Sequence, residues 1–252
     1  MDKNAALFNY ILRLADTNLI LGHRLSEWCG HAPFLEEDIA MANIALDLIG
    51  QSNSLLQYAA KTEGKGRTED DLAYLRNERE YFNSLLSEQP NGDFAFSIVR
   101  QFLSDAFDLH FYEVLKNSKD EMLAALAVKG HKEVIYHFRH TSAWMQRLGD
   151  GTDESHERIQ KALNELWCFT GDLFEMTDSD KYLVKEGIAV DTNLIQDKWL
   201  RSIDEVLEKS KLSRPADSWQ QKGSRQGIHT EHLGFLLAEM QHLHRTHPQA
   251  TW

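Results

Sequence analysis

The 252-residue sequence predicts an all-α protein, a single domain over residues 1–252 built as a bundle of four long helices with two or three further helices at its C-terminal end. Apolar residues recur at spacings of three and four over long stretches, which is the period of a helix with one buried face. No segment of any length alternates as a strand would. The chain is 42% hydrophobic and has only 4 prolines, which suits one helical core.

The first two long helices are predicted over residues 5–25 and 35–62, with short helical pieces following over residues 71–87. Gly30 and Pro33 separate the long helices, and acidic residues at the start of the second suit the positive end of a helix dipole. The first helix has an apolar band wide enough for burial on more than one side. The predicted inner face of the second carries Ile39, Asn43, Leu46, Gly50, Asn53, Leu56 and Ala60.

The third and fourth long helices bring ionisable groups to the inside of the predicted bundle. Asp93 is a plausible N-cap for the third, whose apolar stripe includes Asp105. The fourth covers residues 120–148, and its core-facing stripe includes His137, with Glu133 one turn earlier. Such groups are costly to bury unless they are paired, so they indicate a metal site, a hydrogen-bonded pair or a catalytic pair.

The rest of the chain predicts shorter elements. A fifth helix covers residues 152–171, an irregular segment covers residues 172–189, and Asp191 caps a further amphipathic helix. Residues 213–230 have no period and are predicted to form a long loop. A last helix is predicted over residues 230–247.

Charge and cysteine content restrict the partners and the compartment. The net charge of -12 argues against nucleic acid and against an anionic membrane surface. Cys29 and Cys168 are too few for a disulfide framework or a thiolate metal site. The apolar N-terminal stretch is broken by charges, unlike a secretory signal, and no run approaches the roughly 20 apolar residues of a membrane span. We therefore expect a cytoplasmic protein.

Long helices with inward carboxylates are the frame on which ferritin-like proteins build a di-iron site, so the chain can be tested for its ligands. That site takes a Glu from each of two helices and a Glu-x-x-His from each of the other two. On the fourth helix Glu133 precedes His137 by four residues, and the position three before the histidine is Val134. On the second helix that spacing joins Asp47 to Gly50, without an imidazole.

The sequence therefore supplies too few metal ligands for a di-iron site. The literal motif occurs once, from Glu239 to His242 on the last helix, without a second copy. We predict no metal in this chain, and a degenerate metal site whose buried polar groups hydrogen-bond to one another. Its positions are Asp16, Asn18, Asp47, Gly50, Asp105, Glu133, Val134 and His137. The alternative is a di-iron carboxylate oxidase acting on its own, its metal pair completed by Asp47, Asp105, Glu133 and His137.

One loop is a weaker candidate for contact with a phosphate, a substrate or a partner protein. It carries Lys222, Arg225, Gly227 and His229, although an ordinary surface loop is the simpler interpretation. The chain lacks the nucleophile elbow, the Walker loop, the dinucleotide-binding glycine motif and Cys-x-x-Cys. Hydrolase, kinase and dehydrogenase functions are therefore disfavoured.

Several long segments of the sequence resemble the C subunits of bacterial phenylacetyl-CoA epoxidases, the multicomponent oxygenases of phenylacetate breakdown. These segments are HRLSEWCGHAP, ANIALDLIGQ, EQPNGDFA, KEVIYHFRHTSAWMQRLGDGTD, KEGIAVD and GIHTEHLGFLLAEMQ. The resemblance covers nearly the whole chain and implies a ferritin-like fold. It also implies degraded metal ligands, which agrees with Gly50 standing where a histidine is needed and Val134 where a glutamate is needed.

The resemblance further implies partners and a role. The chain would be a non-catalytic structural subunit that pairs with an iron-bearing catalytic A subunit, in a system that also has a small B subunit and a reductase. It would have no cofactor of its own and would cover an apolar helical face of the A subunit, keeping that subunit's site in shape and dry. A free-standing helical binding module is a third possibility.

Overall fold

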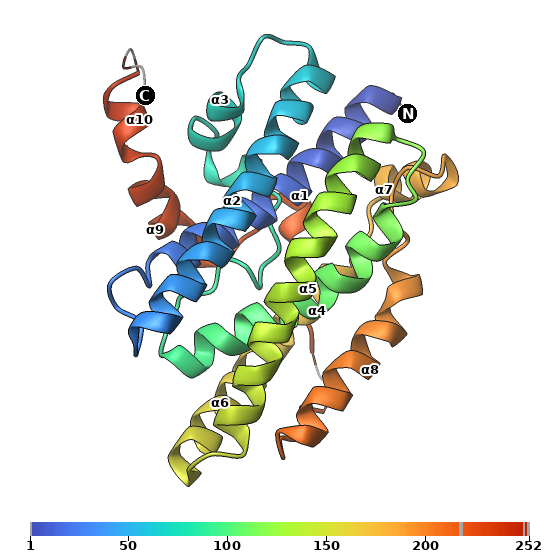
Figure 1. Ribbon diagram of the computed structural model, residues 1–252. Coiled ribbons are helices and arrows are strands. Elements are labelled where there is room, and N and C mark those ends of the chain that lie inside the picture. The colour runs from blue at the N-terminus through green and yellow to red at the C-terminus, as the bar shows by residue number, and fades with distance from the viewer. Residues whose placement is uncertain (1, 217–218, 249, 251–252) are drawn as a thin grey trace.

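The computed structural model describes residues 2–216, 219–248 and 250, and within them the chain forms ten α-helices, three short 3-10 helices and no strand. The all-α prediction is confirmed. Four helices are much longer than most of the others: α1 (Lys3–Ser26), α2 (Leu35–Glu63), α4 (Phe94–Leu115) and α5 (Glu121–Gly149) (Figure 1). Helix α1 packs most closely on α2, and α4 on α5, so the bundle consists of two helix hairpins.

Side-chain caps fix the starts of three of the long helices. The carboxylates of Asp2, Asp93 and Asp120 accept hydrogen bonds from backbone N–H groups in the first turns of α1, α4 and α5. The prediction that Asp93 is an N-cap is confirmed. Helix α2 has no side-chain cap and ends at Gly64, whose left-handed backbone (φ 68°) terminates the helix.

Shorter elements complete the fold. They are α3 (Glu69–Tyr74), η1 (Glu78–Glu80), α6 (Asp153–Leu166), η2 (Trp167–Phe174), α7 (Asp178–Lys185), α8 (Asn193–Lys209), η3 (Ser224–Gln226), α9 (Glu231–Met240) and α10 (His242–Thr246). Of residues 71–87, which were predicted to be helical in pieces, only those within α3 and η1 are helical. Helix α8 starts after Thr192, one residue later than predicted, although Asp191 still accepts a hydrogen bond from the N–H of Asn193.

Two predictions about the C-terminal half are wrong. Residues 172–189 are not irregular, because α7 lies within them, started by a capping box in which Thr177 and Asp180 bond to each other's backbone N–H groups. The last helix is broken at Gln241, whose amide donates to the carbonyl oxygen of Arg76 and to the hydroxyl of Tyr81. These bonds fix the direction of the chain between α9 and α10.

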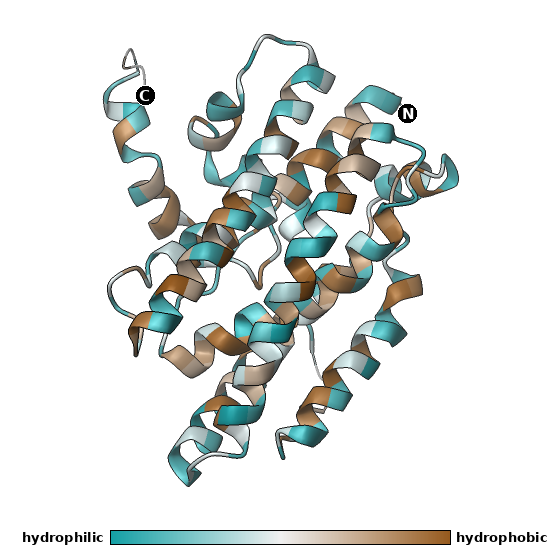
Figure 2. Cartoon of the chain, viewed as in Figure 1, coloured by the Kyte–Doolittle hydropathy of each residue, from teal (hydrophilic) through white to brown (hydrophobic). Residues whose placement is uncertain are grey.

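The predicted inner face of α2 is wrong over most of its length, although Leu56, one of its members, is buried in the core. Ile39 and Leu46 are 54% and 67% exposed, and the face that enters the core is formed by Met41, Ile44, Leu48 and the positions that follow them on the same side. Figure 2 shows brown hydrophobic segments recurring along α2 as well as along the other long helices. Helix α2 therefore buries one apolar face within this chain and also exposes large apolar side chains on its outer side.

Within the described part of the chain, no helix combines the length and the apolar character that crossing a bilayer requires.

Candidate functional site

Each of the four long helices contributes one polar side chain to a network inside the bundle. The amide of Asn18 on α1 donates to Gln51 Oε1 on α2 and to the hydroxyl of Tyr112 on α4, both at 3.1 Å. Tyr112 donates to the same Gln51 oxygen at 2.9 Å. Gln51 Nε2 in turn donates to Glu133 Oε2 on α5 at 2.8 Å. The network thus connects the two helix hairpins through their interior.

A second polar group joins α2 and α5 at the edge of the bundle. His137 is fully buried, and its Nε2 lies 2.9 Å from Asp47 Oδ2. Burial lowers the pKa of His137, and the hydrogen bond to Asp47 only partly opposes this, so the imidazole is neutral at pH 7. Because Nε2 faces a carboxylate, it carries the proton, and the buried Nδ1 is left without a partner among the described residues.

Asp105 lies on α4 and is bound from two sides. Gln101 Nε2 and Thr141 Oγ1 donate to its carboxyl oxygens at 2.6 and 2.9 Å. Burial nevertheless raises the pKa of Asp105 well above its ordinary value. The interior of the bundle thus favours a neutral carboxyl group and a neutral imidazole close to the network.

The structure does not bring all the predicted site positions together. Asp16 turns toward the segment after α3, where it forms an ion pair with Arg76 and accepts a hydrogen bond from the N–H of Phe82. Asp47 is not buried as predicted, since its side chain is 39% exposed. Gly50 lies on the outer side of α2, and a Cβ atom added there would meet nothing within 4 Å. These differences follow from the rotated face of α2 and from the width of the apolar band on α1.

Five of the predicted site positions do lie at the interior side of their helices, although one of them, Glu133, is only partly buried. They are Asn18, Asp105, Glu133, Val134 and His137. Neither Gln51 nor Tyr112 was predicted as a site residue. The available signal was the position of Gln51 four residues after Asp47, which puts both on the side of α2 that faces α5.

The donor set does not fit a di-iron site. Such a site needs several carboxylates and imidazoles converging on one point, whereas two amides and a phenol occupy the centre of this network. Among the residues that the structure describes, no three side chains of His, Cys, Asp or Glu come together in an arrangement that could hold a metal ion. The chemistry that the arrangement supports directly is hydrogen bonding between helices.

The loop proposed as a contact surface is held by its own polar groups. Arg225 donates to the carbonyl oxygens of Phe82, Asp172 and Glu175, and Gly227 lies so close to another backbone segment that a Cβ atom would stand 2.2 Å from a carbonyl oxygen. His229 is also bound, while Lys222 is exposed. A role for this loop in contacting a partner or substrate stays a prediction.

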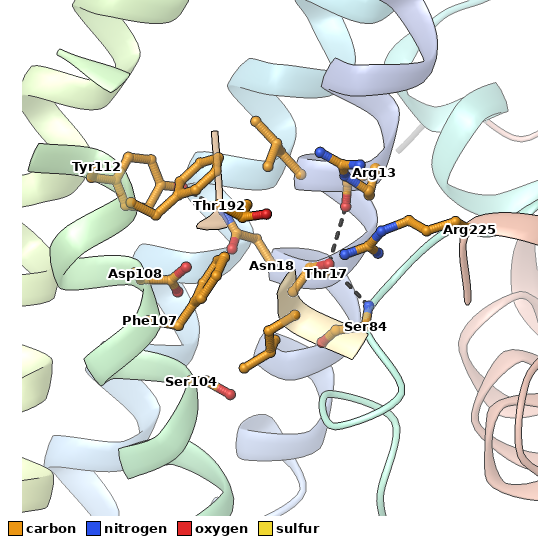
Figure 3. Close-up of a pocket in the computed structure, with 13 residues that line it drawn as sticks. Arg13, Thr17, Asn18, Ser84, Ser104, Phe107, Asp108, Tyr112, Thr192 and Arg225 are labelled. Atoms are coloured by element: carbon orange, nitrogen blue, oxygen red, sulfur yellow. Dashed lines mark hydrogen bonds between the residues drawn. The ribbon is translucent and has the colours of Figure 1, made fainter. Parts of the chain in front are cut away.

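A small cavity lies between α1 and α4 beside the network (Figure 3). Figure 3 shows the carboxyl group of Asp108 pointing into it from α4 and the guanidinium group of Arg225 reaching toward it from the opposite side. The cavity has about 40 Å³ of room, enough for one or two water molecules. Burial raises the pKa of Asp108 to about 7.

Fold and site together define a class: an all-α bundle of two long helix hairpins whose interior polar groups bind one another. The chain belongs to the family described as phenylacetic acid catabolic protein, whose model, PaaA_PaaC, matches residues 1–252. It is 46% identical over 243 residues to the C subunit of the 1,2-phenylacetyl-CoA epoxidase of Escherichia coli (strain K12), a match that covers 96% of this chain and 98% of that protein. The resemblance noted in the sequence is thereby confirmed.

Proposed function

We propose that this chain is a non-catalytic, structural subunit of a phenylacetyl-CoA epoxidase in phenylacetate catabolism. It has a ferritin-like bundle in which a hydrogen-bonded network replaces the metal ligands, and it pairs with an iron-bearing catalytic A subunit. A small B subunit and a reductase complete the cytoplasmic complex, and neither nucleic acid nor membrane takes part. The similarity to the C subunit of an epoxidase over nearly the whole length of both proteins supports this assignment.

The observation that carries the structural role is the network of Asn18, Gln51, Tyr112 and Glu133. Its amide and phenol groups satisfy one another at distances of 2.8 to 3.1 Å, so none of them depends on a metal ion for a partner. A fully satisfied interior network favours one packing of the four helices. The function of the site in this subunit is therefore to hold the bundle in a fixed shape for its partner.

One atom supports a second candidate function, that of a metal-dependent oxidase acting on its own. The Nδ1 atom of His137 is buried and lacks a partner among the described residues, and an unbound imidazole nitrogen is a good ligand for iron. A metal bound there would need the carboxylates of Asp47, Asp105 and Glu133 to move toward it, away from their present hydrogen bonds.

Iron analysis separates the two functions. The purified chain, the His137→Ala variant and the chain co-expressed with its catalytic partner are each measured for iron per polypeptide. We expect far less than one iron per isolated chain, no change in the variant, and iron in the complex that follows the amount of partner. Stoichiometric iron in the isolated chain, lost in His137→Ala, would support the oxidase and contradict the structural role.

A further inference from the structure

We propose that the outer face of α2, together with the adjoining edge of α5, is the surface on which the catalytic subunit docks. This inference rests on the proposed function and adds to it the location of the interface and the chemistry of the partner's surface. The partner fits as a helix whose contacting seam is uncharged and whose flank carries carboxylates.

The outer face of α2 has the pattern of a seam between helices. Its positions follow one another at alternating gaps of four and three residues, which keeps them on one line along a helix that packs on another. They are Ile39, Asn43, Leu46, Gly50, Asn53 and Gln57. None is charged, in a chain of which 26% of residues are charged and whose net charge is -12. A solvated helix face in such a protein would be expected to carry charges.

Gly50 lies at the middle of this seam with open space above it. No atom of the chain would lie within 4 Å of a Cβ atom at this position, so the chain itself does not require a glycine there. Glycine in the middle of a helix lowers stability relative to alanine. A glycine at this position would allow a helix of the partner to approach the backbone of α2 closely.

Helix α5 extends the face. Three side-chain pairs fix the two helices beside each other: His140 with Glu37, His137 with Asp47, and Glu133 with Gln51, at 2.8 to 2.9 Å. Figure 1 shows both helices on the same side of the bundle. Tyr136, which stacks on His140 at this edge, is 41% exposed.

The size of the α2 seam indicates that α5 must take part in the interface. The seam from Ile39 to Gln57 is roughly 27 Å long at 1.5 Å per residue and roughly 10 Å wide, an area on the order of 270 Å². A standard interface takes about 800 Å² from each partner. The seam of α2 alone is therefore too small, and the adjoining edge of α5 is needed to enlarge the contact.

The charges of this face and of the whole chain distinguish a different subunit from a second copy of this chain as the occupant. Lys129 and Lys132 are exposed on α5, so the occupant fits best with carboxylates along that flank. A second copy of this chain would bring two bodies of net charge -12 together, which opposes self-association.

Co-purification of the catalytic subunit with the tagged, co-expressed chain tests the docking face. Leu46→Arg and Gly50→Arg place a charge on the seam without a clash inside the chain, because Leu46 is largely exposed and Gly50 has open space around it. Phe235→Arg on α9 is the matched control, since Phe235 is 68% exposed but lies on another helix. Circular dichroism and thermal midpoints establish that each variant is folded.

We expect the seam variants to reduce the captured catalytic subunit at least tenfold while the control captures it as the unsubstituted chain does. Capture that is unaffected by the seam variants, or lowered equally by the control, would overturn the docking face and leave the proposed function in place. A dimer of the chain alone that Leu46→Arg dissociates would show that a second copy occupies the face. Failure of the unsubstituted chain to capture the subunit would contradict both proposals.

Discussion

His229 and Glu88 form an ion pair in which both side chains are fully buried, 2.8 Å apart. The other nitrogen of His229 faces the carbonyl oxygen of Tyr81, also at 2.8 Å. Both nitrogens thus meet acceptors, which only a protonated imidazole can satisfy as a donor on each side. Burial alone would lower the pKa of His229, but the hydrogen bond and the charge of Glu88 outweigh it, and the pKa is raised.

This pair predicts a loss of stability at alkaline pH. Since the pKa of His229 is higher in the folded than in the unfolded state, the stabilisation is complete below the unfolded value of about 6.5 and disappears as the pH rises through the folded value. Urea unfolding of the unsubstituted chain and of His229→Gln at pH 6 and pH 9 measures this. We expect the difference in unfolding free energy to shrink at pH 9, and an equal difference at both pH values would contradict the charged pair.

Asp108 also predicts a loss of stability as the pH rises, because burial disfavours its ionised form. Its pKa of about 7 in the cavity exceeds the ordinary value of 3.8, so ionisation disfavours the folded state increasingly from pH 4 to pH 7. Asp108→Asn keeps the shape and removes the charge. We expect the variant to be more stable than the unsubstituted chain at pH 8, with a smaller advantage at pH 5, the change being on the order of 2–3 kcal/mol. A pH-independent effect would show that Asp108 does not titrate in the cavity.

At the scale of elements, two glycines in long helices have opposite surroundings. A Cβ atom on Gly22 of α1 would stand 2.9 Å from a side-chain atom of Ile49 and 3.2 Å from the carbonyl oxygen of Ala45, both on α2. Gly22 therefore permits the close packing of α1 on α2. Gly50 on the outer side of α2 has no neighbour of this kind.

Replacing each of these two glycines with alanine is expected to change the stability of the chain in opposite directions. Gly22→Ala forces the first helix hairpin apart and costs about 1–3 kcal/mol, the range for overpacked cores. Gly50→Ala raises helix propensity without a clash and stabilises the isolated chain by about 0.5–1 kcal/mol. Chemical denaturation of both variants measures the changes. A destabilised Gly50→Ala would mean that the outer face of α2 is packed within the chain.

The elements that sequence alone located are those with a long period and a recognisable cap, such as the helix that begins after Asp93. The inner face of α2 could not be located, because Ile39 and Leu46 are as apolar as the residues on its buried side. A period identifies apolar faces but does not tell which neighbour covers them. Helix α7 was missed because eight residues are too few to show a period, although Thr177 and Asp180 carry a capping box.

At the scale of the whole molecule, the interior network is what ties the two helix hairpins together. Its existence was predicted in general terms from inward polar residues such as Asn18 and Glu133. The residues that form the network were not predicted correctly, because a shift of one residue on α2 changes the position that faces the interior from Gly50 to Gln51. That shift is a rotation of about 100° around the helix. Asp16 was misplaced because the wide apolar band on α1 left open which neighbour each residue faces, and Arg76 lies on that other side.

Substitution of Gln51 measures how much the network contributes to the stability of the bundle. Gln51→Leu removes the shared acceptor of Asn18 and Tyr112 and the donor to Glu133, and it leaves their polar atoms in the interior without these bonds. We expect a loss of about 1–3 kcal/mol in unfolding free energy, the usual cost of unsatisfied buried groups. Gln57→Leu, an exposed position on the same helix, serves as the control and is expected to change stability little.

The measurement that tests the structural role most directly is epoxidation of phenylacetyl-CoA by the complex reconstituted from purified subunits. The reaction is followed with the unsubstituted chain, without it, and with His137→Gln, each complex being checked for intact assembly. We expect activity to require the chain and His137→Gln to support it at the unsubstituted level. Loss of activity in an intact complex containing His137→Gln would place chemistry in this chain and contradict its structural role.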